Sequence, residues 1–378
     1  MPPPVAGAGK LVDGTDELMA KKLAFDKVLF AVVLVLLAGG LVMVYSASIS
    51  SGVAATSGLN PFVKQLIAAV IGLAAMGVAM QIDYRQLRKP IFLYAIVGAI
   101  VLLLIAVLFS PPLNNSRRWL FLAGLSMQPS ELAKVAIVLF MAYQIDKKID
   151  KVNSPAVLVP CVSMTALAVV LVLLEPDLGT AGLLVVIAGM MLFLAGLSWR
   201  FVLVATGVAL PALWFLILAV PYRRERFFSF LDPEQDPLGS GFQVLQSMIA
   251  VGSGGPWGLG LGGSVQKLHF LPLAESDFIY SILAEELGLI GAFGVVMLFL
   301  VFFLRGVRAG SRAPETFGRY LAWGLTTLIA MQALLNMSET IALVPTTGTT
   351  LPLISYGGSS LVTTLAACGL ILNVSQHG

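Results

Sequence analysis

Two carboxylates enter a long apolar segment near residue 278 at a spacing that suits acid–base chemistry. Asp277, Ser281 and Glu285 follow one another at four-residue intervals, so a helix that begins near Asp277 would place all three on one face. Asp277 would lie at the mouth of that helix, with Glu285 about 12 Å further along it. Carboxylates are costly inside a bilayer, so we favour a functional role: general base, cation ligand or proton relay.

A second group of charges precedes and begins another apolar segment. The Pro-Ser pair at 129–130 predicts a helix start, which puts Glu131 and Lys134 three residues apart on one helix face. Arg117 and Arg118 lie just before it. One interpretation is an interfacial ion pair with arginines that extend to the membrane surface. The other is a binding site for an anionic head group, which the forked donors of arginine suit.

Two further polar segments interrupt the apolar sequence. Residues 175–180 read Glu-Pro-Asp-Leu-Gly-Thr, which is either an ordinary proline turn or a second acidic site around Asp177. The second begins with Asn-Met-Ser-Glu at 336–339 and continues through residues 343–360, which are rich in hydroxyl groups, glycine and proline and include Ser355 and Tyr356. Irregular backbone at membrane depth is tolerated where it is buried in protein or lines a cavity. This segment is therefore either a re-entrant loop with a packing role or part of a site.

These residues must be positioned by membrane-spanning helices. The chain has 378 residues, of which 58% are hydrophobic and 11% charged, and its mean hydropathy is +0.93. A soluble domain carries roughly 25% charged residues, so a soluble enzyme and a disordered chain are both excluded. A spanning helix needs about 20 apolar residues. We predict an all-α integral membrane protein with ten spans, at 28–49, 62–82, 91–110, 130–146, 155–174, 180–197, 201–220, 278–304, 316–337 and 358–374.

The basic residues predict how the spans are oriented. With the N-terminus in the cytoplasm, 15 of the 23 Lys and Arg residues fall in cytoplasmic segments, which favours N-in, C-in topology. Residues 221–276 then form a large external loop between spans seven and eight. Residues 1–24 are interpreted as a flexible cytoplasmic tail, and 25–378 as a single transmembrane domain. The remaining basic residues, Arg226 and Lys267 among them, need another reason for their positions.

Other classes of site are disfavoured. The net charge of +3 is too small to suggest a nucleic-acid partner. Cys161 and Cys368 lack the spacing of a disulfide framework or a zinc site. Seven glycines between residues 252 and 263 resemble a phosphate-binding loop only superficially, because no Gly-Lys-Ser/Thr follows them. We expect these glycines to let the backbone bend and pack tightly at the membrane surface.

Four motifs, in order along the chain, resemble those of the SEDS family (shape, elongation, division and sporulation). They are Ser-Arg-Arg-Trp with Gln-Pro-Ser-Glu-Leu-Ala-Lys (116–119, 128–134), Glu-Pro-Asp-Leu-Gly-Thr-Ala (175–181), Ser-Asp-Phe-Ile with Ala-Glu-Glu-Leu-Gly-Leu-Ile-Gly (276–279, 284–291) and Leu-Pro-Leu-Ile-Ser-Tyr-Gly-Gly-Ser-Ser (351–360). The resemblance runs from about residue 25 to the end. Tyr45-Ser46 and 348–352 are more similar to FtsW-type division members than to RodA-type elongation members. Family members often carry Ala-His-Thr where this chain has Ala-Glu-Ser at 274–276.

The resemblance implies a peptidoglycan glycosyltransferase that polymerises lipid II at the outer face of the bacterial cytoplasmic membrane. It implies Asp277 as the general base. It also implies a divalent cation, Mg²⁺ or Mn²⁺, as the one candidate cofactor, with no organic cofactor. The implied partners are lipid II, undecaprenyl-linked glycan, a class B penicillin-binding protein and other membrane proteins of the division complex. The candidate substrate-binding or cavity residues are Arg117, Arg118, Trp119, Glu131, Lys134, Asp177, Ser276, Ser281, Glu285, Ser355 and Tyr356.

Two other functions fit parts of the sequence. A transporter such as a lipid flippase also uses many spans, intramembrane charges and broken helices. Against it, the two halves show no convincing internal repeat, and the unusual charges gather toward the external side. A scaffold that recruits a partner is a third interpretation, and it is compatible with the first.

Overall fold

The computed structural model describes residues 25–49, 60–112, 116–122, 125–268 and 270–378, so the predicted tail at 1–24 lies outside the described residues. One long helix corresponds to each of the predicted spans. They are α2 (Lys27–Ile49), α3 (Pro61–Gln81), α4 (Pro90–Val107), α5 (Pro129–Lys147), α6 (Pro155–Leu174), α7 (Leu178–Leu194), α8 (Trp199–Leu218), α11 (Ile279–Arg312), α12 (Thr316–Thr340) and α13 (Gly358–Gln376).

The helices form a membrane-type bundle. Within the described residues, eight of them are long and apolar enough to cross a bilayer by length and composition. The other two are α7, which has 17 residues, and α5, which carries two charged residues in its first two turns and two near its end. Almost every residue of α5 is buried, because it packs against α4, α6, α7 and α12. The prediction of a helical multi-pass membrane protein is confirmed.

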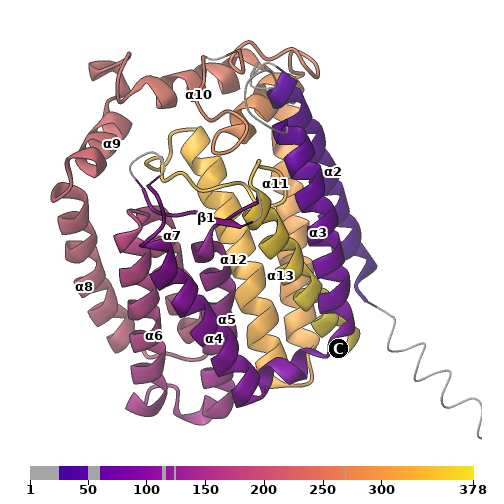
Figure 1. Ribbon diagram of the computed structural model, residues 1–378, viewed down its shortest axis with the longest axis vertical. Coiled ribbons are helices and arrows are strands. Elements are labelled where there is room, and N and C mark those ends of the chain that lie inside the picture. Colours follow the sequence, from indigo (N-terminus) through magenta and orange to yellow (C-terminus); the bar gives the residue numbers. More distant parts are fainter. Residues whose placement is uncertain (1–24, 50–59, 113–115, 123–124, 269) are drawn as a thin grey trace, which may run out of the picture.

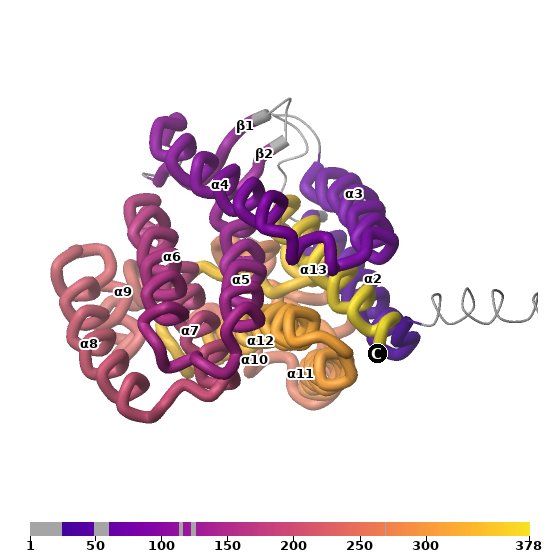
Figure 2. Tube along the Cα trace, turned by 90° about the horizontal axis from the view of Figure 1, so that it is seen from below, coloured from indigo at the N-terminus to yellow at the C-terminus, as the bar shows by residue number. Residues whose placement is uncertain are grey.

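Close helix contacts form the centre of the bundle. The most extensive pairs are α3 with α13, α11 with α12 and α5 with α12 (Figures 1 and 2). Small residues permit these approaches: a Cβ added to Gly369 of α13 would lie 2.6 Å from Met76 O of α3. In contrast, α8 stands at the edge of the bundle, and none of its residues is buried (Figure 2). Its apolar surface is therefore left for lipid or a partner.

The segment expected to be a large loop, 221–276, is substantially helical. It contains α9 (Pro221–Leu231), the 3₁₀ turn η4 (Pro233–Gln235) and α10 (Phe242–Ser253), which lie across one end of the bundle (Figure 1). One face of α10 buries Val244, Ser247 and Ala250 against α11, so the contact with α11 covers this face of the helix.

A small hairpin of β1 (Leu120–Leu122) and β2 (Leu125–Met127) also departs from the all-α prediction. The short turns η2 (Tyr84–Arg88) and η3 (Ile149–Lys151) lie at the opposite end.

Helix α11 is broken at Gly288, where φ is 67°. A Cβ on Gly288 would lie 2.3 Å from Gly258 N, so the glycine-rich segment reaches the helix backbone directly. Leu259 N donates to Glu285 O at 3.0 Å, Gly260 N donates to Glu286 O at 2.9 Å, and Leu289 N donates to Gly255 O at 2.9 Å. The break is tolerated because these bonds satisfy the freed backbone groups. The prediction of tightly packed glycines is confirmed.

Candidate functional site

Asp277 lies just before α11, at the end of the bundle covered by α9 and α10. Its carboxylate faces the segment that joins α12 to α13: a Cβ on Gly348 would stand 3.4 Å from Asp277 Oδ2. Gly348 has φ of 79°, so a side chain there would be strained as well as crowded. Burial raises the pKa of Asp277 to about 6, although a hydrogen bond from Ser276 and the charges of Arg226 and Arg118 oppose the rise.

The main chain around Asp277 is tied to the segment at 349–357. Ser355 Oγ donates to Ser276 O at 2.6 Å, and Tyr356 N donates to Glu275 O at 2.8 Å. Asn336, from α12, donates to Asp277 O at 2.8 Å. Ser276, Ser355 and Tyr356 therefore lie beside Asp277, and they bring together two motifs that are far apart in the sequence.

Arg118 contacts the turn that contains Asp177, and the charges of both residues act on Asp277. Arg118 Nε donates to Glu175 O at 3.0 Å, another guanidinium nitrogen donates to Pro176 O, and Arg118 Nη1 lies 3.9 Å from Asp177 Oδ2. Asp177 caps α7 by accepting from both the Thr180 backbone and its hydroxyl at 3.0 Å. Residues 175–180 thus form both the predicted proline turn and the predicted acidic site, and Arg118 binds to this turn.

Glu175 is fully buried beside this arginine. Burial, and then the charge of Asp177, raise the pKa of Glu175 to about 8, against the lowering effect of Arg118. Among the described residues neither of its carboxylate oxygens has a hydrogen-bond partner. Burial therefore favours the protonated form of Glu175, and Asp177 is the carboxylate of this turn that lies toward Arg118.

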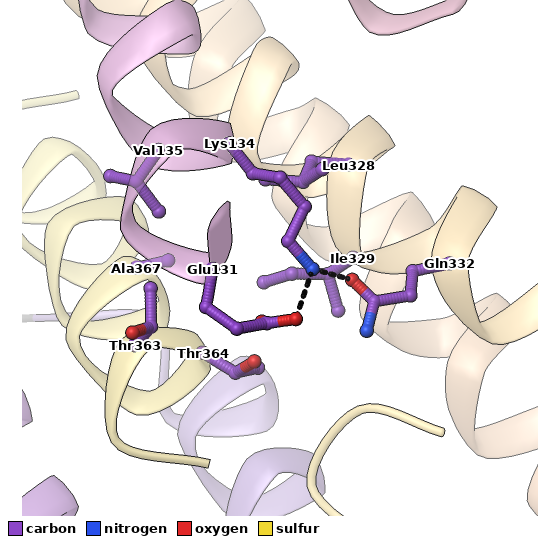
Figure 3. Close-up of a pocket in the computed structure, with 9 residues that line it drawn as sticks. All are labelled: Glu131, Lys134, Val135, Leu328, Ile329, Gln332, Thr363, Thr364 and Ala367. Atoms are coloured by element: carbon purple, nitrogen blue, oxygen red, sulfur yellow. Dashed lines mark hydrogen bonds and ion pairs between the residues drawn. The ribbon is translucent and has the colours of Figure 1, made fainter. Parts of the chain in front are cut away.

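Glu131 and Lys134 form the predicted ion pair on α5. Lys134 Nζ lies 2.9 Å from Glu131 Oε1, and it also donates to Gln332 Oε1 on α12 at 2.6 Å. Both charged side chains are buried, at a small cavity between α5, α12 and α13 (Figure 3). The lysine in Figure 3 points at the glutamine and the glutamate rather than out of the bundle. The pair is linked to the Asp277 region through Gln332, whose Nε2 donates to Thr350 O at 3.0 Å.

The other predicted residues lie apart from the Asp277 carboxylate. Ser281 Oγ lies 2.6 Å from Ser247 Oγ of α10, and Glu285 accepts from Ser264 Oγ at 2.5 Å and from Val265 N at 3.1 Å. The expected helical stripe is thus split, since Ser281 and Glu285 hold residues 221–276, which we call the outer segment, onto α11. Arg117 is exposed and donates to Leu108 O at 2.8 Å.

Trp119 is the remaining predicted residue. It is half-buried just before β1.

Several residues of the site were not predicted from the sequence. Arg226 of α9 donates to Thr346 O at 3.2 Å, and its guanidinium lies over the Tyr222 ring. Glu339 of α12 accepts from Thr347 Oγ1 and, at 3.2 Å, from Thr349 Oγ1. Arg226 could have been found as an external arginine that breaks the positive-inside rule. Asn336 and Glu339 belong to the polar segment that the sequence singles out, but no local pattern predicts their contacts with the Asp277 region.

The fold and this site define a polytopic membrane protein with an acidic centre at one end of its helix bundle. The sequence model of the cell cycle protein family that groups FtsW, RodA and SpoVE matches residues 26–378, and the chain belongs to that family.

Curated relatives and solved structures are similar over most of their length. A probable peptidoglycan glycosyltransferase FtsW of Geobacter metallireducens is 44% identical, over 93% of this chain and 95% of its own. The stage V sporulation protein E of Bacillus subtilis is 39% identical, over 95% and 99%. A chain of a peptidoglycan synthase complex superposes with a TM-score of 0.76 at 33% identity, over 93% and 98%. The rod shape determining protein RodA of Thermus thermophilus gives 0.67 at 30% identity, over 93% and 97%.

Proposed function

We propose that this protein is a peptidoglycan glycosyltransferase that polymerises lipid II during cell division, with Asp277 as its general base. The observation that carries the proposal is Asp277 itself: a carboxylate with a raised pKa, a fixed main chain and two arginines that influence its charge. The relatives named FtsW support the activity, and their similarity over nearly the whole chain supports the division role over the elongation role of RodA.

The reaction joins the C4 hydroxyl of one N-acetylglucosamine to the anomeric carbon of the N-acetylmuramic acid at the end of the growing chain. A C1–O bond forms to the acceptor, the C1–O bond to phosphate breaks, and undecaprenyl pyrophosphate leaves. The hydroxyl proton passes to the Asp277 carboxylate. General-base assistance of this kind is typically worth about 10²–10⁴-fold. A pKa of about 6 leaves most Asp277 side chains ionised at neutral pH while making them stronger bases than an ordinary aspartate.

The leaving pyrophosphate needs positive charge, and arginine suits it because its donors are forked. Arg118 and Arg226 are the candidates, since the charge of each acts on Asp277 and lowers its pKa. Arg117 is exposed on the same loop as Arg118.

A divalent cation remains a prediction. Among the described residues, no three His, Cys, Asp or Glu side chains are grouped so as to hold one, so we assign no step to a metal.

The proposed setting is the cytoplasmic membrane, with the Asp277 end facing outward and a class B penicillin-binding protein as partner. The basic residues support the orientation. The similarity to a chain of a peptidoglycan synthase complex supports a partner that is itself a synthase. Co-purification of the full chain with its cognate penicillin-binding protein tests this pairing, and failure of the two proteins to associate in detergent and in bilayers would contradict it.

Polymerisation of lipid II by the purified full chain, alone and with that partner, tests the function. We expect Asp277→Asn to lower the rate at least 10²-fold while the protein stays folded and binds lipid II, since only the base is removed. Asp232→Asn is the matched control, because Asp232 is an exposed carboxylate of the same outer segment. A polymerisation rate near that of the unaltered protein in Asp277→Asn would overturn the assignment, and translocation of lipid II without polymer would favour a transporter.

A further inference from the structure

A single buried amide near the outer end of α12 connects the Asp277 main chain to the segment that covers it. Asn336 Nδ2 donates to Asp277 O at 2.8 Å and to Thr349 O at 2.7 Å, and the Asn336 side chain is fully buried. The two carbonyl groups belong to segments before α11 and after α12. Because both are acceptors, only the donor end of the amide can face them, and its orientation is fixed.

Gln332, one helical turn earlier, makes the equivalent contact with the next carbonyl. Its Nε2 donates to Thr350 O at 3.0 Å, and its Oε1 accepts from Lys134 at 2.6 Å. An ammonium group can only donate, so Lys134 determines which end of the Gln332 amide faces Thr350. Residues four apart lie on one helix face, and the two amides together hold the consecutive carbonyls of Thr349 and Thr350.

The position of Asn336 is not explained by packing alone. Among the described residues, its Oδ1 accepts no hydrogen bond although it is buried. An unsatisfied buried acceptor costs free energy that an apolar side chain of similar size would avoid. What asparagine supplies at this position, and leucine could not, is a pair of donated hydrogen bonds to Asp277 and Thr349.

We infer that Asn336 is a positioning residue for the polymerase, which fixes the Asp277 main chain against the 349–350 segment so that the carboxylate meets the acceptor hydroxyl. The inference rests on the proposed function of Asp277. Asn336 touches no reacting atom. Its effect is exerted through the backbone of the residue that does, and a misplacement of about 1 Å can cost 10²-fold in rate.

Asn336→Asp tests this, because it keeps the shape but replaces the donor with carboxylate oxygen. We expect kcat for lipid II to fall about 10–100-fold with KM changed less than threefold, since the substrate contacts are left intact. Asn373→Asp is the matched control: Asn373 is a buried amide of α13, at the opposite end of the bundle, that donates to Met80 O at 2.8 Å and Ile82 O at 3.0 Å. We expect it to lower stability while kcat of the folded protein stays within threefold of that of the unaltered protein.

Two outcomes overturn the inference: Asn336→Asp retains kcat within threefold, or Asn373→Asp loses as much kcat as Asn336→Asp. If Asn336→Asp does not fold, Asn336→Ser, which is neutral and too short to reach both carbonyls, is judged by the same criteria.

If the unaltered protein makes no polymer, the proposed function fails on its own. Amide hydrogen exchange of residues 345–357 then decides the positioning role. Exchange at least tenfold faster in the Asn336 variants, but not in Asn373→Asp, supports it, and unchanged exchange contradicts it.

Discussion

At the scale of single residues, the polar groups in this bundle serve in two different ways. Asp277 is half-buried, and burial raises its pKa while the charges of Arg226 and Arg118 lower it. Glu131 and Lys134 are buried in the bundle and neutralise each other. The surroundings of Asp277 suit acid–base catalysis, because its carboxylate can take up and release a proton. The Glu131–Lys134 pair fixes the orientation of Gln332, and through it the segment that faces Asp277.

The acid limb of the pH–rate profile tests the protonation state of Asp277. The base must be ionised, so kcat/KM is expected to rise with pH and to reach half its plateau near pH 6. Arg226 lowers the pKa of Asp277, so Arg226→Gln is expected to move that midpoint to higher pH, in addition to any loss of rate. Steady-state polymerisation between pH 5 and 9 measures both. A midpoint that moves to lower pH in Arg226→Gln would contradict this electrostatic account.

The buried ion pair predicts different effects on stability and on activity. Lys134→Met leaves the Glu131 carboxylate unpaired and is expected to destabilise the protein by about 3–5 kcal/mol. Combining it with Glu131→Gln removes that charge and should recover most of the thermal stability, measured by unfolding in detergent. The activity of the double variant is expected to stay low, because Gln332 still lacks its lysine donor. Full recovery of polymerisation in the double variant would show that orientation of Gln332 is unimportant.

At the scale of elements, the broken helix α11 and the glycine-rich segment form one unit. The carboxylate of Glu285 binds Ser264 and the Val265 amide, and Lys267 Nζ lies 2.7 Å from Glu286 Oε1, which also accepts from Ser46 of α2. These contacts anchor the outer segment to the part of α11 that follows Asp277. They account for Lys267, whose external position opposed the positive-inside rule.

The break in α11 can be tested with two glycines of the same helix. Gly288→Ala introduces a Cβ at positive φ and 2.3 Å from Gly258 N, so we expect a destabilisation of more than about 1 kcal/mol. Gly294→Ala meets nothing within 4 Å and should be neutral or stabilising by about 0.5–1 kcal/mol. Thermal unfolding of both variants measures the difference. Equal stability would mean that the break does not require glycine.

At the scale of the whole molecule, the site lies at one end of the bundle and the basic residues gather toward the other. Arg85 and Arg88 pair with Glu315 and Asp146 near the turns at the end opposite Asp277. This separation fits the proposed orientation, in which the Asp277 end faces outward and the basic end faces the cytoplasm.

Thiol labelling in intact cells tests the orientation. The two native cysteines are buried, so they give little background. Ser240→Cys in the outer segment and Ser311→Cys at the end of α11 both replace exposed serines. A membrane-impermeant maleimide is expected to label the first from outside and the second only after the membrane is opened. The reverse pattern would overturn the N-in assignment.

The sequence by itself determined the spans, and it singled out Asp277 as the candidate central residue. Apolar runs of about 20 residues are a local property, and each predicted run became a helix. The helix ends lie within three residues of those predicted, except that α11 continues eight residues beyond the predicted 304, to Arg312. The Glu131–Lys134 pair was equally predictable, because spacing along one helix fixes which side chains meet. Asp277 stood out because charge is rare and costly in such a chain.

Only the tertiary structure decided how these residues are grouped. The helical spacing of Asp277, Ser281 and Glu285 suggested one stripe, yet α11 begins after Asp277 and its deeper polar residues bind the outer segment instead. Asn336 and Gly348 lie against Asp277, and the charge of Arg226 acts on it, from three segments that no local pattern connects. Contacts between distant segments depend on how helices pack and where loops fold back, and a one-dimensional pattern records neither. The sequence therefore identified Asp277, and packing determined what surrounds it.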